Sequence, residues 1–169
     1  MSSIKIVADS TCDLSSELIR DYGITILPLN IVLDMTSYSD GEEISPDEIY
    51  VWAQANKRTP KTAAVAFDRA LALVKGMKEN QEEVIFIGIS SEMSTTCNVM
   101  RLVKEELEYD RMFIIDSRNL STGIGLQVLR AAQLAQEGRS AEEIVKEIEE
   151  ARDKVRASFV VERLDYLAM

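Results

Sequence analysis

Short apolar runs alternate with longer amphipathic segments along this chain. Three of these runs are rich in isoleucine and valine and are bounded by polar residues, which predicts buried strands. They cover residues 4–8, 84–89 and 112–115. A fourth run, residues 24–33, contains Pro28, which has no N–H to donate to a sheet. We expect this run to form either an edge strand or two short extended pieces.

Helix-start signals follow the strands. Ser45 precedes Pro46 and two acidic residues, and Ser140 precedes Glu143 by three positions, which is typical of helix N-termini. Apolar residues with helical spacing predict the bodies of the other helices. The expected helices cover residues 14–22 with Asp13 as the cap, a segment from residue 46, segments around Phe67–Val74 and Val99–Leu107, residues 123–137, and residues 140 to about 157.

The alternation of strands and helices predicts the fold class. Buried strands separated by helices form βαβ units, so we expect an α/β fold with a mostly parallel sheet flanked by helices. We assign residues 1–157 to this domain. A new extended run begins at Phe159, close to the last residue, Met169. We therefore expect residues 158–169 to be the start of a second, truncated C-terminal domain.

Composition excludes several classes of function. The 169 residues carry a formal net charge of −10 with a pI of about 4.6, which argues against nucleic-acid binding. The absence of histidine excludes Ser-His and Cys-His catalytic pairs and histidine metal ligands. Cys12 and Cys97 are expected to be reduced, buried thiols. With no apolar run long enough for a membrane span and no signal-peptide pattern, we expect a cytoplasmic protein without a membrane span.

Each of the three predicted strands leads directly into a loop rich in hydroxyl side chains. These loops are Asp9–Thr11, Ser90–Thr96 and Asp116–Gly123. In a parallel sheet they share the carboxyl edge, and each precedes a helix N-terminus, where hydroxyls and free backbone N–H groups bind anions without a basic side chain. One such loop is an ordinary helix cap, but three on one edge favour a binding crevice. Thr62 also precedes a predicted helix. Its side chain could cap that helix within a turn or contact a ligand, and the sequence leaves both roles open.

Catalysis has weaker support. Asp9 and Asp116 follow two of the strands and, if those strands are neighbours, could hold a divalent metal for phosphate-ester hydrolysis. However, the chain lacks the Asp-x-Asp spacing of aspartyl-phosphate phosphatases and a glycine-rich phosphate loop with lysine. We therefore interpret both aspartates as residues that orient loops, and we expect no metal and no cofactor.

The order of several short motifs points to a known family. The chain resembles the DegV family of bacterial fatty-acid-binding proteins, which includes the fatty-acid-binding subunit of fatty acid kinase. The resemblance covers nearly the whole chain. The matching motifs are residues 6–14 (IVADSTCDL), 27–29 (LPL), 38–45 (YSDGEEIS), 60–62 (PKT), 87–94 (IGISSEMS), and 115–117 (IDS) with 123–125 (GIG).

The resemblance implies a ligand and two of its contacts. A long-chain fatty acid would lie between the α/β domain and a second domain, with its carboxylate held by hydroxyls and backbone amides. The resemblance marks Thr62 and Ser94 as carboxylate ligands, and we add Thr95, Ser10 and Ser121 from the hydroxyl-rich loops. Two departures concern this site: alanines follow Thr62 where the family has further hydroxyls, and Thr95 replaces a glycine.

The resemblance also implies a partner. The protein would be a carrier, not an enzyme, and would present the fatty acid to the separate catalytic subunit of fatty acid kinase. The alternatives are the metal-dependent hydrolase that uses Asp9 and Asp116, and a structural fragment without independent function. Without a second domain over the acyl chain, we also expect self-association of this chain through the exposed apolar groove.

Overall fold

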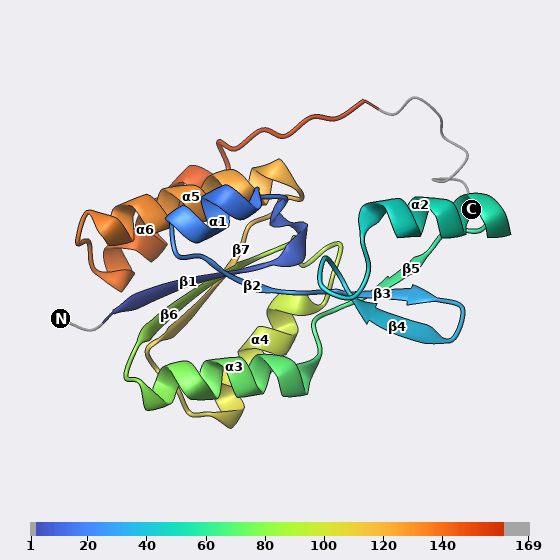
Figure 1. Cartoon of the computed structure of the whole chain (residues 1–169). Coiled ribbons are helices and arrows are strands. Elements are labelled where there is room, and N and C mark those ends of the chain that lie inside the picture. The colour runs from blue at the N-terminus through green and yellow to red at the C-terminus, as the bar shows by residue number, and fades with distance from the viewer. Residues whose placement is uncertain (1–2, 161–169) are drawn as a thin grey trace.

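The computed structural model describes residues 3–160 and contains a four-stranded parallel sheet (Figure 1). Its strand order is β2-β1-β6-β7. Strand β6 is buried along almost its whole length because helices cover both faces of the sheet. The strands are β1 (Ile4–Asp9), β2 (Thr25–Leu27), β6 (Glu83–Gly88) and β7 (Met112–Asp116).

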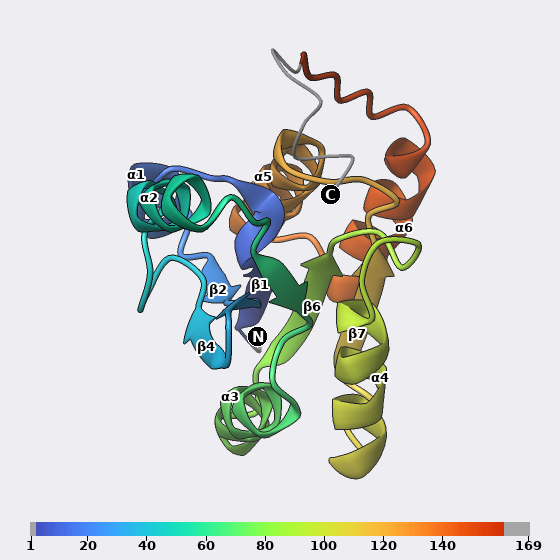
Figure 2. The same cartoon turned by 90° about the vertical axis from the view of Figure 1, so that its right-hand side faces the viewer.

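Helices pack on both faces of this sheet, as the end-on view shows (Figure 2). Alternate residues of β1 point to opposite faces, so Ile6 and Ala8 join one apolar cluster while Val7 joins the other. The first cluster lies under α1, α5 and α6, and the second lies under α3 and α4. These helices are α1 (Ser16–Asp21), α3 (Phe67–Glu79), α4 (Thr96–Glu106), α5 (Thr122–Gln136) and α6 (Ala141–Arg152), and a single 3-10 turn, η1 (Ser10–Cys12), follows β1.

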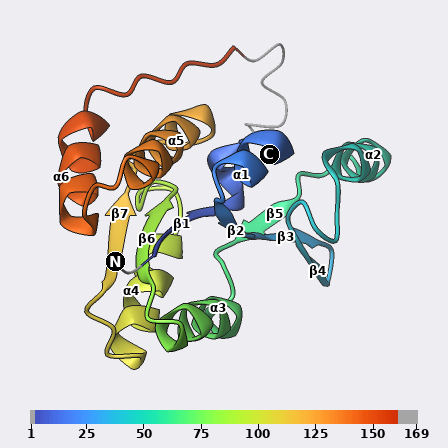
Figure 3. The ribbon, with the colours of Figure 1, turned by 60° about the vertical axis from the view of Figure 1, so that its left-hand side comes forward.

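Residues 30–63 form a smaller unit beside the parallel sheet (Figure 3). Its antiparallel sheet has the order β4-β3-β5. A separate apolar cluster of Ile31, Leu33 and Ile44, with Trp52 packed against it, joins this sheet to helix α2. We call residues 30–63 the small unit, and we call the rest of the described fold the body. The elements of the small unit are β3 (Asn30–Leu33), β4 (Thr36–Ser39), α2 (Pro46–Asn56) and β5 (Lys61–Ala63).

The fold class predicted from the sequence is confirmed for the body. The run with Pro28 forms two extended pieces, because β2 pairs with β1 and β3 belongs to the other sheet. The antiparallel sheet was not predicted. Thr62 is not a helix cap, as one interpretation had it, but a strand residue paired with Ile31. A signal for the hairpin was present, since only Asp34 and Met35 separate β3 from β4.

Two predicted helix ends were wrong. Ser15, rather than Asp13, caps α1 and accepts a hydrogen bond from the Leu18 N–H at 3.3 Å. Asp13 has a left-handed backbone conformation with φ of 50°, which separates η1 from that helix. The last helix ends at Arg152 rather than near residue 157. The helix starts predicted at Ser45 and Ser140 are confirmed, and both serines form capping boxes.

The proposed start of a second domain lies mostly outside the described residues. Phe159 and Val160 are exposed and belong to no strand, and residues 161–169 are not described. The boundary at residue 157 therefore stays a prediction.

A close backbone contact joins α5 to the loop after β1. A Cβ atom on Gly125 would lie 2.7 Å from the carbonyl oxygen of Cys12, which is closer than real Cβ contacts. Only glycine therefore allows η1 to pack directly on the first turns of α5.

We predict that Gly125→Ala lowers the free energy of unfolding by about 1–3 kcal/mol, because backbone atoms must move to accept the methyl group. Gly76→Ala is the matched control: Gly76 lies in α3, and apart from its chain neighbours and the backbone of its own helix no atom lies within 4 Å of its would-be Cβ. That change should raise the stability by about 0.5–1 kcal/mol through helix propensity. Urea unfolding measures both, and equal stabilities for the two variants would contradict the close contact.

Candidate functional site

The three hydroxyl-rich loops meet at one edge of the parallel sheet. Strands β1, β6 and β7 are parallel neighbours, so the loops that follow them lie at the same carboxyl edge (Figure 2). The loop after β6 also contacts the loop after β7 directly, because the Ser90 N–H donates to the Asn119 carbonyl at 3.0 Å. The sequence prediction that these loops come together is thus confirmed.

Asp9 joins the first of these loops to the second. Its carboxylate is fully buried and accepts hydrogen bonds from the Ile89 N–H at 2.7 Å, from the Thr11 N–H at 3.0 Å and from the Thr11 hydroxyl. Burial raises the pKa of Asp9 above its ordinary value, although these hydrogen bonds act in the opposite direction. Asp40 of the small unit adds a smaller upward contribution to this pKa.

Asp116 joins the third loop to the second in a similar way. Its two carboxylate oxygens accept from the Arg118 N–H at 2.9 Å and from the Ser91 N–H at 3.3 Å. Burial acts to raise the pKa of Asp116, but hydrogen bonds from Arg118 and Ser91 outweigh it and the pKa lies below its ordinary value.

Asp9 and Asp116 lie on β1 and β7, which are not neighbouring strands. The predicted metal site required neighbouring strands, so that the two carboxylates could approach each other. Strand β6 lies between β1 and β7, and Asp116 pairs with Gly88 of β6. Two strand spacings separate the aspartates by about 10 Å. Among the described residues, no group of three or more cysteine, aspartate or glutamate side chains gathers as a metal site.

Two of the predicted hydroxyls already have structural partners. The Ser10 hydroxyl accepts from the Leu29 N–H at 3.1 Å and so holds the chain that leads to the small unit. The Ser94 hydroxyl accepts from the Thr96 N–H at 3.2 Å and shares a 2.9 Å hydrogen bond with the Thr96 hydroxyl. Ser94 is half-buried, whereas Thr96 is fully buried at the start of α4.

The other predicted residues have different surroundings. Thr95 and Ser121 stand at the N-termini of α4 and α5, and neither side chain makes a capping hydrogen bond. Ser121 has φ of 51° and ψ of −132°, a backbone conformation that residues other than glycine rarely adopt. Thr62 lies on β5 of the small unit, with its side chain exposed.

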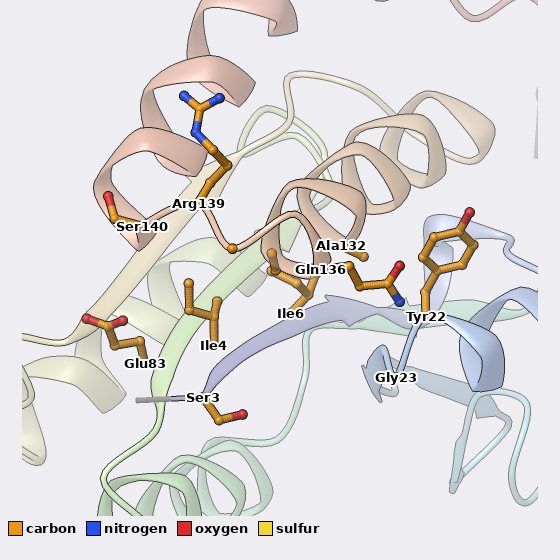
Figure 4. A pocket seen from close by; sticks show the side chains of 12 residues that line it. Ser3, Ile4, Ile6, Tyr22, Gly23, Glu83, Ala132, Gln136, Arg139 and Ser140 are labelled. Atoms are coloured by element: carbon orange, nitrogen blue, oxygen red, sulfur yellow. The ribbon is translucent and has the colours of Figure 1, made fainter. Parts of the chain in front are cut away.

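A large cavity lies at the opposite, amino edge of the parallel sheet (Figure 4). It has a volume of about 520 Å³. Its floor is apolar and includes Ile4, Ile6 and Ala132, while Tyr22 and Arg139 stand at its margin. None of the five predicted site residues lines it.

The fold and the motif positions lead to a family. A family model described as "Uncharacterised protein, DegV family" matches residues 3–169. The chain belongs to the DegV family. A DegV domain-containing protein of Clostridium perfringens is 41% identical over 167 residues, which cover 99% of this chain and 60% of that protein. A DegV domain-containing protein of Caldanaerobacter subterraneus is 35% identical, and the match covers 99% of this chain and 59% of that protein. The chain thus spans about 60% of the length of these relatives.

Solved DegV structures share this fold. A DegV-family protein from Thermus thermophilus, described by its fatty-acid binding, has a TM-score of 0.82 and 31% identity, over 89% of this chain and 54% of that one. The Bacillus subtilis protein DegV, described as a fatty acid binding protein, has a TM-score of 0.83 and 26% identity, over 90% and 55%. A stearic-acid-binding protein from Eubacterium ventriosum has a TM-score of 0.78 and 26% sequence identity, and the match covers 88% of this chain and 52% of that one. The DegV resemblance and fold class inferred from the sequence are confirmed.

We predict that Asp9→Asn lowers the free energy of unfolding by about 1–3 kcal/mol, because an amide NH₂ cannot replace a carboxylate oxygen as an acceptor and leaves a buried N–H unpaired. Asp13→Asn is the control, since Asp13 is exposed and asparagine also tolerates its left-handed conformation. Denaturant unfolding at neutral pH measures both variants. An Asp9→Asn protein as stable as Asp13→Asn would show that this carboxylate does not hold the loops.

Asp116 should make stability depend on pH. Because its folded-state pKa is lowered, its stabilising contribution is present above the ordinary aspartate pKa, about 3.9, and is lost as the pH falls through the folded-state value. The stability difference between the wild type and Asp116→Asn should therefore shrink as the pH falls below about 4. Urea unfolding at a series of pH values checks this, and a difference that stays constant down to acid pH would contradict it.

Proposed function

We propose that this chain binds a long-chain fatty acid, with the carboxylate at the carboxyl edge of the parallel sheet. The observation that carries this proposal is the meeting of three hydroxyl-rich loops at that edge, in a fold whose solved relatives from Thermus thermophilus and Bacillus subtilis are described as fatty-acid-binding proteins. In this proposal hydroxyls and backbone N–H groups hold the anion, as they do at other helix N-termini.

Ser94 is the central residue of the proposed site. Its oxygen accepts from the Thr96 N–H and is hydrogen-bonded to the Thr96 hydroxyl. When Thr96 donates in that second bond, the Ser94 proton is free to point at a carboxylate. Donation along a chain of hydroxyls also polarises the terminal O–H and strengthens the bond that it makes.

We propose that the hydroxyl of Thr62, which belongs to the small unit, is the second side chain that donates to the fatty-acid carboxylate. Thr95, Ser10 and Ser121 are proposed to line the same edge, with Ser10 acting mainly through its bond to Leu29. We propose that exposed apolar side chains close to these residues in the sequence contact the first carbons of the acyl chain. Met93 directly precedes Ser94 and is 60% exposed, and Leu126 near the start of α5 is 57% exposed.

We propose a carrier rather than an enzyme. Asp9 and Asp116 both use their carboxylate oxygens to accept backbone N–H bonds, an arrangement that favours loop orientation over the hydrolase alternative. From the family resemblance we also propose that the carrier presents the fatty acid to a separate kinase subunit. A cytoplasmic location is proposed as well. No helix among the described residues has both the length and the apolar character to cross a membrane.

The domain assignment is also a proposal: residues 1–157 form the lipid-binding domain and residues 158–169 begin another. The relatives contain length that this chain does not match. We propose that this additional part covers the acyl chain. A chain without that part would expose the same apolar surface, and we propose that such a chain self-associates there.

We predict that Ser94→Ala weakens palmitate binding about tenfold or more, since a charge-assisted hydrogen bond contributes about 1.5–3 kcal/mol. Isothermal titration of the delipidated protein measures the affinity. Ser140→Ala is the matched control: Ser140 also accepts a backbone N–H bond at a helix start, but it borders the cavity at the amino edge. Equal losses of affinity in the two variants would attribute the effect to helix capping and contradict the site.

A further inference from the structure

The small unit and the body share few contacts between their helices and strands. The chain passes between them twice, at residues 28–29 and at residues 64–66. Both connections are anchored in the body, because Leu29 and Val65 belong to the apolar cluster under α3 and α4. Two hydrogen bonds also join the units at these connections: the Asn30 amide donates to the Ala64 carbonyl at 2.8 Å, and the Asp40 N–H donates to the Leu29 carbonyl at 2.9 Å. These bonds fix where the small unit is attached, and contacts farther from the connections restrain its angle to the body.

This angle matters for the proposed carboxylate site, and the present inference rests on that proposed function. Thr62 belongs to the small unit, whereas Ser94 belongs to the body. The separation of their hydroxyls therefore depends on how the small unit is oriented, and a carboxylate contacts both only when each lies within hydrogen-bond reach.

Arg69 makes a side-chain contact across this junction. It lies in the first turn of α3, which the buried residues Ala70 and Val74 anchor to the body. Its Nη2 donates to both carboxylate oxygens of Glu42, at 2.6 and 2.7 Å, and its Nη1 donates to the Ser39 hydroxyl at 3.1 Å. Ser39 ends β4 and Glu42 lies in the turn that follows, so both acceptors belong to the small unit.

We propose that Arg69 is a positioning residue that holds the small unit at one angle to the body and thereby sets Thr62 against Ser94. Three hydrogen bonds to two separate residues restrict rotation more than a single point contact does. The Arg69 and Glu42 side chains are 42% and 49% exposed, so salt should weaken this contact. The orientation of the small unit should accordingly become less defined at high ionic strength.

The single tryptophan gives a direct measurement of this orientation. Trp52 belongs to α2 of the small unit, packs against the apolar cluster of that unit, and serves as a fluorescence donor. A Lys75→Cys substitution on the exposed side of α3 accepts a coumarin label on the body. Cys12 and Cys97 are buried, so the label reacts with the introduced cysteine. Time-resolved energy transfer then reports the distribution of distances between the two units.

We expect a narrow distance distribution in otherwise wild-type protein and a broader one in Arg69→Gln. The charge-exchanged variant, Arg69→Glu with Glu42→Arg, should recover part of the narrow distribution. Arg130→Gln is the control, because Arg130 Nε donates to Glu147 at 2.8 Å and both residues lie within the body, away from the fluorescence donor. A distribution that stays narrow in Arg69→Gln, or broadens equally in Arg130→Gln, would overturn the positioning role.

Palmitate titration of the unlabelled variants completes the test. Arg69→Gln should bind about three- to fivefold more weakly than the wild type, and Arg130→Gln should bind as the wild type does. Broadening without any loss of affinity would overturn the link between Arg69 and the ligand site. If the wild type itself binds no palmitate, the proposed function fails, and the distance distributions alone decide whether Arg69 orients the small unit.

Discussion

The carboxylate of Asp9 is the contact on which the carboxyl edge of the sheet depends. It stands at the end of β1, is fully buried, and accepts the N–H of Ile89 just beyond β6. It also accepts the Thr11 N–H and so starts the turn that places Cys12 against Gly125 of α5. A neutral apolar side chain there would leave these N–H groups buried without acceptors. The same carboxylate therefore fixes the loop after β1, the loop after β6 and, through η1, the start of α5.

The proposed site combines this fixed edge with a less firmly attached unit. Ser94 is held by hydrogen bonds to Thr96 at the beginning of α4, so its position follows from the body alone. Thr62 lies on a strand of the small unit, whose angle we assign to the contacts of Arg69 with Glu42 and Ser39. A carboxylate ligand that contacts both hydroxyls would join the two units. The ligand would then stabilise one orientation of the small unit.

The sequence predicted the body of the fold well because its strands and helices carry strong local signals. Buried parallel strands such as β6 (Glu83–Gly88) are nearly continuous apolar runs, and Ser45 and Ser140 each begin a complete capping box. The small sheet was missed because β5 is short and fully exposed, so its residues show no apolar alternation. Asp13 was misassigned as a cap because a left-handed residue and an N-cap favour the same amino acids. The strand pairing of Thr62 and the contacts of Arg69 join distant segments, which no local pattern reveals.

In the proposed binding mode, the carboxylate of a fatty acid binds at the hydroxyl-rich carboxyl edge of the sheet and not in the cavity at the amino edge. Two-dimensional ¹H–¹⁵N NMR spectra recorded during a palmitate titration test it most directly, because each amide reports its own surroundings. We expect the amides of Thr62, Ser94 and Thr95 to shift first and to saturate together, while those of Gly23 and Gly138 beside the amino-edge cavity stay unchanged. Shifts confined to Gly23 and Gly138, with Ser94 unaffected, would contradict it.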